Sequence, residues 1–287
     1  MKFALILREK AAFPVAFMCR QLQVSRSGYY AWAVREPSQR ARTDAELVPL
    51  IRAEFHEHPR GCGSRTVVGS LREAGRGVSR RRVVRLMAQE RLRPTYKRRF
   101  VRTTDSRHGL RTARNVVARN FTVGAPNKIW AADITYLQTK CGWAYLAVVL
   151  DLGTRKVVGW NVSPSLEQDG AIAALRAAIE TRGPHSGLTH HSDRGVQYAG
   201  DAYRALLARN GIACSMSRRG NCWDNAVVES FFSSLKRELG RDAPFEDWRD
   251  ADRAVFEYIE SYYNTRRRHS ALGYISPSRY ENLVQAA

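Results

Sequence analysis

The spacing of hydrophobic residues changes its period near residue 121, and helical spacing dominates before that point. Residues 13–24 (FPVAFMCRQLQV) are apolar at helical intervals, and SRSGYYAWAV then interrupts the pattern. Two short helices joined by a tight turn fit this stretch, with Ser25 or Ser27 as the candidate N-cap. Residues 36–43 (EPSQRART) are typical of a linker.

A second helical unit begins at Asp44 and contains segments 44–58, 63–75 and 78–92, separated by glycines. In the last segment Ser79 is a candidate N-cap, and the apolar stripe toward the core is Val83, Val84, Leu86 and Met87. Short helices and a final helix with a basic N-terminal end predict a helix-turn-helix-like DNA-binding domain. A plain helical bundle with a charged face remains the alternative. The arginines expected to contact DNA are Arg80, Arg81, Arg82 and Arg85.

Beyond residue 121 the pattern favours strands. Residues 128–138, 143–153 and 156–164 predict three antiparallel strands joined by tight turns. Helical and strand patterns then alternate, with strands at 187–193 and 212–217 and helices at 165–183, 199–211, 224–239 and 243–264. Together they predict an α/β fold with a mixed five-stranded sheet and flanking helices.

The domains expected from these patterns follow the chain in order. They are an N-terminal helical, helix-turn-helix-like segment (1–43), a helix-turn-helix-like domain (44–98), a basic linker that tracks the phosphate backbone (99–120), a catalytic core (121–240) and a C-terminal helix with a basic tail (241–287).

Charge is distributed unevenly over the 287 residues, whose formal net charge is +20. Residues 1–120 hold 27 of the 47 basic residues and only 9 of the 27 acidic ones. An excess this large favours a polyanionic partner, most simply nucleic acid. The sequence shows neither a signal peptide nor an apolar run of membrane-spanning length, so a soluble cytoplasmic protein is expected.

Five scattered cysteines without a CxxC pair argue against a disulfide framework. His56, His58 and Cys62 lie close enough in sequence to suggest zinc, but no second pair of ligands follows, and the segment is interpreted as a loop.

Three acidic residues occupy positions that border the predicted sheet. Asp193 follows the fourth strand, where open α/β sheets place their ligands. Asp133 lies within the first strand beside the core, where an acid carries a desolvation cost unless a cation compensates it. Glu229 flanks the core stripe of helix 224–239. Asp151 and Asp169 are interpreted as a turn former and a helix-start residue.

Carboxylates from two strands and a helix can hold two hard cations, such as Mg²⁺, through oxygen ligands. Two such ions, about 3.5–4 Å apart, stabilise the attacking and leaving oxygens of a phosphoryl displacement. Metal binding would explain why a DNA-binding protein keeps an acidic pocket, although any single aspartate at a strand end is more often a turn former.

Longer motifs point to a family. Thirty-five residues separate Asp193 from Glu229, and with HSDRGVQY, WDNAVVESFFSSLKREL and YYNTRRRHSALGYISPSRY the chain resembles transposases of two-reading-frame bacterial insertion sequences. The segments SRSGYYAW and GCGSRTV extend this resemblance over nearly the whole chain.

The resemblance implies a ribonuclease-H-like core with a retroviral-integrase-like DDE triad formed by Asp133, Asp193 and Glu229, dependent on Mg²⁺ or Mn²⁺. Lys236 matches a family position that contacts the element's terminal DNA; a solvated surface lysine is the alternative. The reaction implied is hydrolysis at the element's 3′ ends, followed by attack of the freed 3′-OH on target DNA. A homo-oligomer in the synaptic complex is expected.

Active enzymes of this family are commonly frameshift fusions with an upstream-frame (OrfA) partner that carries a leucine zipper. Because the chain begins at Met1 and shows no sustained heptads, it is expected to be the downstream-frame (OrfB) protein.

The segment NTRRRHS, with Arg266, Arg267 and Arg268, is expected to bind the DNA backbone, with a solvated helix end as the alternative.

Two other functions stay open: a non-catalytic DNA-binding regulator, and a ribonuclease-H-like nuclease that cuts without joining. Loss of a triad acid would favour the regulator, and none is lost; a strand-transfer assay separates the nuclease from the transposase.

Overall fold

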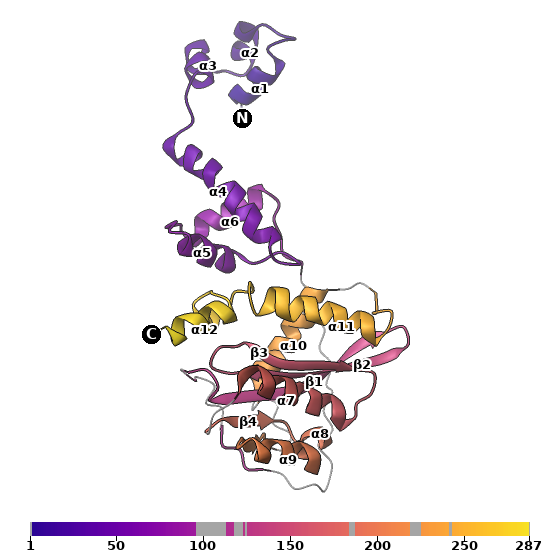
Figure 1. The fold of residues 1–287 in the computed structure, drawn as a ribbon. Helices are drawn as coiled ribbons and strands as arrows, with labels where there is room; N and C mark the ends of the chain where they lie inside the picture. The colour runs from indigo at the N-terminus through magenta and orange to yellow at the C-terminus, as the bar shows by residue number, and fades with distance from the viewer. Residues whose placement is uncertain are drawn as a thin grey trace. The chain divides into compact units, whose positions relative to one another are not determined.

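The computed structural model of the chain describes residues 2–95, 113–117, 123, 125–183, 187–218, 225–240 and 243–286 (Figure 1). Most of the expected basic linker, 99–120, lies outside these residues. The chain divides into two compact units, residues 1–51 and 52–287.

The first unit contains three short helices, α1 (Lys2–Glu9), α2 (Val15–Gln21) and α3 (Arg26–Ala33). The two helices expected after residue 13 are therefore confirmed, and α1 precedes them. Ser25 is the N-cap of α3, since its side chain accepts a hydrogen bond from the backbone N–H of Gly28 at 3.0 Å. The small core of this unit is formed by Ile6, Met18, Cys19 and Tyr29.

Helix α4 (Gln39–His56) begins inside the segment expected to be a linker and continues into the second unit. Helices α5 (Ser64–Glu73) and α6 (Arg80–Gln89) follow it, as the glycine spacing predicts. Ser79 caps α6 by accepting a hydrogen bond from the backbone N–H of Arg82. Val84 was expected to face the core, but 46% of it is exposed, because the buried stripe of α6 comprises only Val83, Leu86 and Met87.

The sheet has five strands in the order β3-β2-β1-β4-β5. Strands β1 (Ile129–Thr139), β2 (Gly142–Asp151) and β3 (Val157–Ser163) form an antiparallel meander, while β4 (Thr189–Ser192) and β5 (Ala213–Met216) run parallel to β1. The mixed five-stranded sheet is thus confirmed.

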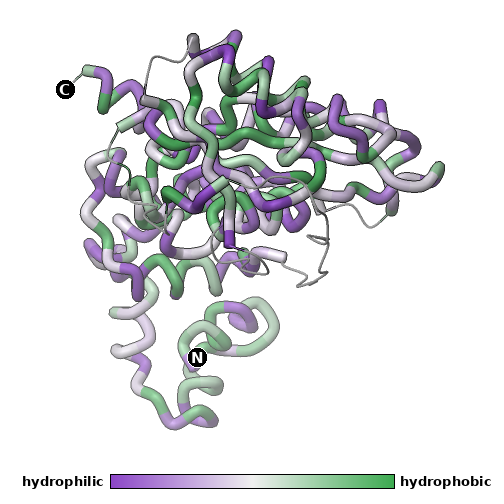
Figure 2. Tube along the Cα trace, turned by 90° about the horizontal axis from the view of Figure 1, so that it is seen from below, coloured by the Kyte–Doolittle hydropathy of each residue, from purple (hydrophilic) through white to green (hydrophobic). Residues whose placement is uncertain are grey.

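Helices cover both faces of the sheet (Figure 1). On one face lie α7 (Gln168–Arg182), the short α8 (Val196–Ala199) and α9 (Asp201–Arg209). Gly159 of β3 permits the close approach of α7, because a Cβ at this position would lie 2.2 Å from the carbonyl oxygen of Ala174. Figure 2 shows hydrophobic and hydrophilic residues alternating along helical turns of the chain, as amphipathic packing requires.

The opposite face is covered by α10 (Ala226–Leu239), α11 (Trp248–Phe256) and the π-helix η2 (Glu257–Tyr263). The expected core stripe of α10 is confirmed, with Val228, Phe231, Phe232 and Leu235 buried and Leu239 partly buried. The long helix expected at 243–264 begins at Trp248. Asp247 is its N-cap, since its side chain accepts a hydrogen bond from the backbone N–H of Asp250. A 3₁₀ turn, η3 (Ser270–Leu272), and helix α12 (Pro277–Gln285) complete the described chain.

Candidate active site and DNA-binding residues

Asp133, within β1, and Asp193, directly after β4, lie beside each other on two neighbouring parallel strands. The register pairs Ala132 of β1 with Ser192 of β4. Asp133 and Asp193 directly follow these two paired residues, so they are neighbours across the two strands. A backbone N–H holds each carboxylate: Ile134 donates to Asp133 Oδ1 at 2.8 Å, and Gly195 donates to Asp193 Oδ1 at 2.9 Å. Asp193 therefore follows the fourth strand as predicted.

Glu229 belongs to the first turn of α10, on its exposed side. The helix is held against the sheet by its buried stripe and by one hydrogen bond next to the aspartates. The side-chain amide of Asn225, which precedes α10, donates to the carbonyl oxygen of Ala132 at 3.1 Å. Asn225 is 4% exposed, so this bond fixes the start of α10 relative to β1.

The three carboxylates act on one another electrostatically. Burial raises the pKa of Asp133 well above its usual value; the charge of Asp193 and, less strongly, that of Glu229 add to this, while the Ile134 N–H and Lys236 lower it. Burial and then Asp193 raise the pKa of Glu229. Negative charges gathered in this way favour the approach of a cation.

The carboxylates do not form a closed metal site, however. Among the described residues, one group alone brings three candidate ligand atoms within 4.8 Å of one another, and it is formed by Glu54, His58 and Cys62. The oxygens of Asp133, Asp193 and Glu229 do not all lie within this distance of one another, and their like charges repel.

Two buried polar atoms beside the carboxylates have no hydrogen-bond partner among the described residues: the hydroxyl of Tyr198 and Oδ1 of Asn225. Burial, then Tyr203 and the charges of Asp133 and Asp193, raise the pKa of Tyr198 well above its usual value. Sequence reasoning assigned a role to neither residue. An asparagine directly before a helix could have been recognised as a capping candidate, but its contact with β1 depends on the tertiary fold.

Lys236 lies two helical turns after Glu229 on α10, with an exposed side chain. Its positive charge reaches Asp133, where it opposes the rise in pKa caused by burial and by Asp193. Lys236 and Asp133 therefore lie close enough to act on each other electrostatically.

Arg80, Arg81 and Arg82 lie in the first turn of α6, and Arg85 lies in its middle. Arg80 and Arg81 are exposed, while Arg82 and Arg85 are half-buried. Arg80 Nε donates to Ser64 Oγ at 3.2 Å, and Arg85 donates to Gln89 at 3.2 Å.

The three consecutive arginines of NTRRRHS have different surroundings. Arg266 is exposed, with 64% of its side chain accessible and Glu57 3.5 Å away. Arg267 donates to both oxygens of Glu238 at 2.8 and 2.9 Å, and to Ser234 at 3.1 Å.

Arg268 is directed at the helical domain. Its Nε donates to Glu54 at 3.0 Å, and its other nitrogens contact Glu73, Ser70 and the carbonyl oxygen of Tyr274. Arg267 and Arg268 thus have partners inside the protein, at distant sequence positions that no local pattern could indicate. Arg266 is thus the most exposed of the three arginines, and the expected contact of this basic patch with the DNA backbone stays a prediction.

Asp151 is a turn former, as interpreted. Its carboxylate accepts hydrogen bonds from the backbone N–H groups of Asn127, Gly153 and Thr154 at 2.7–3.2 Å.

The described residues include no helix long and apolar enough to span a bilayer.

Comparison with known proteins assigns the chain to the polynucleotidyl transferases with an integrase core. The family model "Integrase core domain" matches residues 124–222, a second model of that description matches residues 210–277, and "HTH-like domain" matches residues 42–100. The chain belongs to the DDE transposases of bacterial insertion sequences, as its curated relatives show.

One such relative, "Transposase InsF for insertion sequence IS3A" of Escherichia coli (strain K12), is 38% identical over 98% of this chain and 99% of its own length. Another, "Insertion element IS600 uncharacterized 31 kDa protein" of Shigella sonnei, is 41% identical over 92% of this chain and 97% of its own. These matches confirm the resemblance inferred from the motifs.

Solved structures with similar folds are more distant. A chain of the simian T-cell lymphotropic virus intasome is 17% identical, with a TM-score of 0.45 over 77% of this chain and 70% of that one. The HTLV-2 integrase catalytic core domain in complex with magnesium is 18% identical, with a TM-score of 0.42 over 55% of this chain and 97% of that one.

Proposed function

We propose that Asp133, Asp193 and Glu229 are the catalytic triad of this transposase. The observation that carries the proposal is the β1–β4 register, which places the two aspartates side by side, together with their electrostatic coupling to Glu229. The reaction proposed is cleavage at the 3′ ends of the element, followed by joining of the freed 3′-OH to target DNA.

The donor set fits divalent Mg²⁺ or Mn²⁺, two ions per site, since all three side chains offer hard carboxylate oxygens. The raised pKa values of Asp133 and Glu229 and the unpartnered Tyr198 hydroxyl support a site that binds cations. When bound, such ions would increase the nucleophilicity of the attacking oxygen and stabilise the leaving one.

Neighbouring residues hold the three carboxylates in position, and Lys236 is proposed to bind the DNA. The backbone N–H groups of Ile134 and Gly195 hold the aspartates in place, and Asn225 fixes the helix that carries Glu229. Lys236 supplies a positive charge for a phosphate next to the scissile bond. A fixed geometry of this kind contributes to the rate because the reacting groups need no further ordering.

Duplex DNA binding is proposed for the N-terminal end of α6, through Arg80, Arg81, Arg82 and Arg85, and for the exposed Arg266. Arginine side chains at the first turn of a helix-turn-helix reader can contact both phosphates and base edges. We further propose that the chain acts as a homo-oligomer on paired element ends, with an upstream-frame (OrfA) protein as partner or fusion.

The decisive experiment uses Asp193→Asn on labelled element-end DNA with Mg²⁺, scoring nicked and joined products. The variant should lose cleavage and joining by several orders of magnitude while binding DNA within a few fold of wild type, because only the metal-binding charge is removed. Asp169→Asn, at an exposed helix start, is the matched control and should retain activity. Full strand transfer by Asp193→Asn would refute the triad, and wild-type nicks without joined ends would favour a nuclease.

A further inference from the structure

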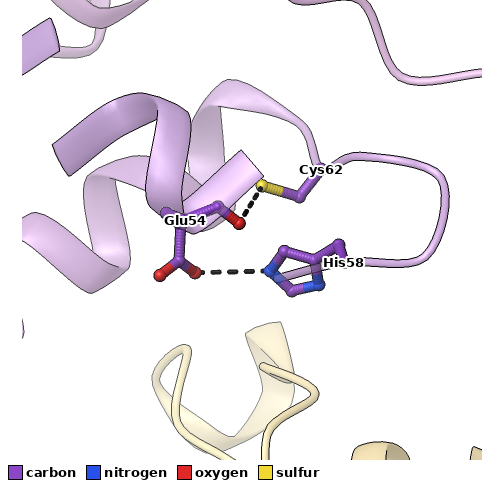
Figure 3. A group of neighbouring side chains, drawn as sticks. All are labelled: Glu54, His58 and Cys62. Carbon is purple, nitrogen blue, oxygen red and sulfur yellow. Dashed lines mark hydrogen bonds and ion pairs between the residues drawn. The ribbon is translucent and has the colours of Figure 1, made fainter. Parts of the chain in front are cut away.

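A second cluster of potential metal ligands lies far from the carboxylate triad in sequence. Glu54 is in the last turn of α4, His58 lies just beyond that helix, and Cys62 lies in the loop before α5 (Figure 3). One ligand atom from each lies within 4.8 Å of the other two, and Glu54 Oε1 is 3.3 Å from His58 Nε2. His58 and Cys62 follow the end of α4, and the loop that holds them turns back so that both side chains contact Glu54 in the last helical turn.

The cluster is enclosed, and its ligands are oriented by neighbours. His58 is 9% exposed and Cys62 4%. The hydroxyl of Tyr262 is 2.6 Å from His58 Nδ1, which leaves Nε2 directed at Glu54. Ser70 Oγ donates to Glu54 Oε2 at 2.5 Å. Hydrogen bonds to the far atoms of the histidine and the carboxylate are the usual supporting contacts of a metal site.

We propose that Glu54, His58 and Cys62 bind a single transition-metal ion of the zinc class. Nitrogen, sulfur and one carboxylate oxygen form a mixed donor set that suits Zn²⁺, and three protein ligands leave one position for water. The all-oxygen triad of Asp133, Asp193 and Glu229 instead suits Mg²⁺ or Mn²⁺. The two sites therefore select different ions.

The charges at the cluster are compatible with a dication. Burial raises the pKa of Glu54, but hydrogen bonds from His58 and Ser70 and the charge of Arg268 outweigh it, and the carboxyl group is anionic at neutral pH. Burial and then Glu54 raise the pKa of the Cys62 thiol to about 12, with Arg268 opposing them. Binding of a dication would release the thiol proton of Cys62, and the Cys62 thiolate together with the Glu54 carboxylate would balance its two positive charges.

Arg268 is the contact that opposes metal binding, since its Nε donates to Glu54 Oε1 at 3.0 Å. A carboxylate oxygen has two lone pairs, so one oxygen can accept this bond and still coordinate an ion. The guanidinium charge is balanced separately by Glu73. The remaining contact in the cluster, Cys62 Sγ with the carbonyl oxygen of Glu54 at 3.8 Å, is too weak to retain the thiol.

Of the three proposed ligands, His58 lines a pocket of about 480 Å³, together with neighbours that include Arg60 and Arg93. An ion entering there would tie the α4–α5 loop to the last turn of α4. Because a bound metal stabilises only the folded state, it would strengthen the helical domain that carries α6.

The experiment titrates the full chain with Co²⁺ alone, after chelator treatment, in excess Mg²⁺ that occupies oxygen-only sites. One equivalent should produce a thiolate-to-cobalt charge-transfer band, which Zn²⁺ displaces. Cys62→Ser should abolish the band, and Tyr262→Phe should weaken metal affinity about 10- to 100-fold. His56→Gln and Cys141→Ser are matched controls that change a histidine and a cysteine outside the cluster and should leave the band intact.

A thermal melt gives a second readout. Zn²⁺ should raise the midpoint of wild type and of His56→Gln, but not of Cys62→Ser or His58→Gln. The proposal is overturned if the charge-transfer band is absent, if it survives Cys62→Ser, or if it disappears in Cys141→Ser.

Discussion

Replacing Arg267 with alanine tests whether this residue supports the fold or contacts DNA. Its guanidinium bonds both oxygens of Glu238 and Ser234, all on α10, and lies 5.7 Å from the ring centre of Tyr263. The side chains of Arg267 and Glu238 are 16% and 12% exposed. Burial raises the pKa of Glu238, but Arg267 outweighs it and keeps the pKa below its usual value.

Removing one partner of a buried ion pair costs about 3–5 kcal/mol, because the other charge stays buried without compensation. Glu238 would keep the Tyr258 hydroxyl at 2.8 Å and Arg237 at 3.5 Å. The expected loss for Arg267→Ala is therefore near the lower limit, about 3 kcal/mol. Since α10 carries Glu229, cleavage activity should fall as well.

The assay is denaturant unfolding at neutral pH, with Arg266→Ala as the matched control. Arg266 is the exposed neighbour, 3.5 Å from Glu57, and its loss should change the unfolding free energy by less than about 0.5 kcal/mol. The reasoning is refuted if Arg267→Ala unfolds like wild type and instead loses DNA affinity, with a salt slope reduced by about one.

Three further predictions address the site, the core and the DNA interface. Asn225→Ala removes a buried hydrogen bond worth about 1–3 kcal/mol, and should lower the cleavage rate more than DNA affinity; an unchanged rate would exclude a positioning role. Burial and then His191 lower the pKa of His190 to about 3, so wild-type stability should fall by up to about 1.4 kcal/mol per pH unit as pH drops below about 6.5. His190→Gln should lack this part of the pH dependence. If urea unfolding gave the same slope of stability against pH for the variant and wild type, the prediction would be contradicted. Alanine at Arg80, Arg81 and Arg82 should weaken DNA binding and flatten its salt dependence by roughly 0.9 per lost phosphate contact; an unchanged slope removes α6 from the interface.

Local patterns were sufficient for most of the secondary structure of the core domain. Period-two alternation marks a strand whichever neighbour it pairs with, and the apolar stripe of α10 identified its buried face directly. The position of Asp193 after a strand was readable for the same reason. These features depend on residues close together in sequence.

The partners of charged side chains depended on the tertiary structure. Arg266, Arg267 and Arg268 form one basic run in sequence, yet Arg267 contacts Glu238 and Arg268 contacts Glu54 and Glu73. A sequence shows that a residue is charged, but not whether the nearest opposite charge is a phosphate or a carboxylate about 200 positions away.

Metal ligands follow the same rule. The sequence brought His56, His58 and Cys62 to notice, whereas the folded chain replaces His56 with Glu54. The difference arises because ligand geometry depends on the direction of each side chain at the end of α4. Residue spacing limits which atoms can meet, and packing of distant segments such as the one containing Tyr262 decides which of them do.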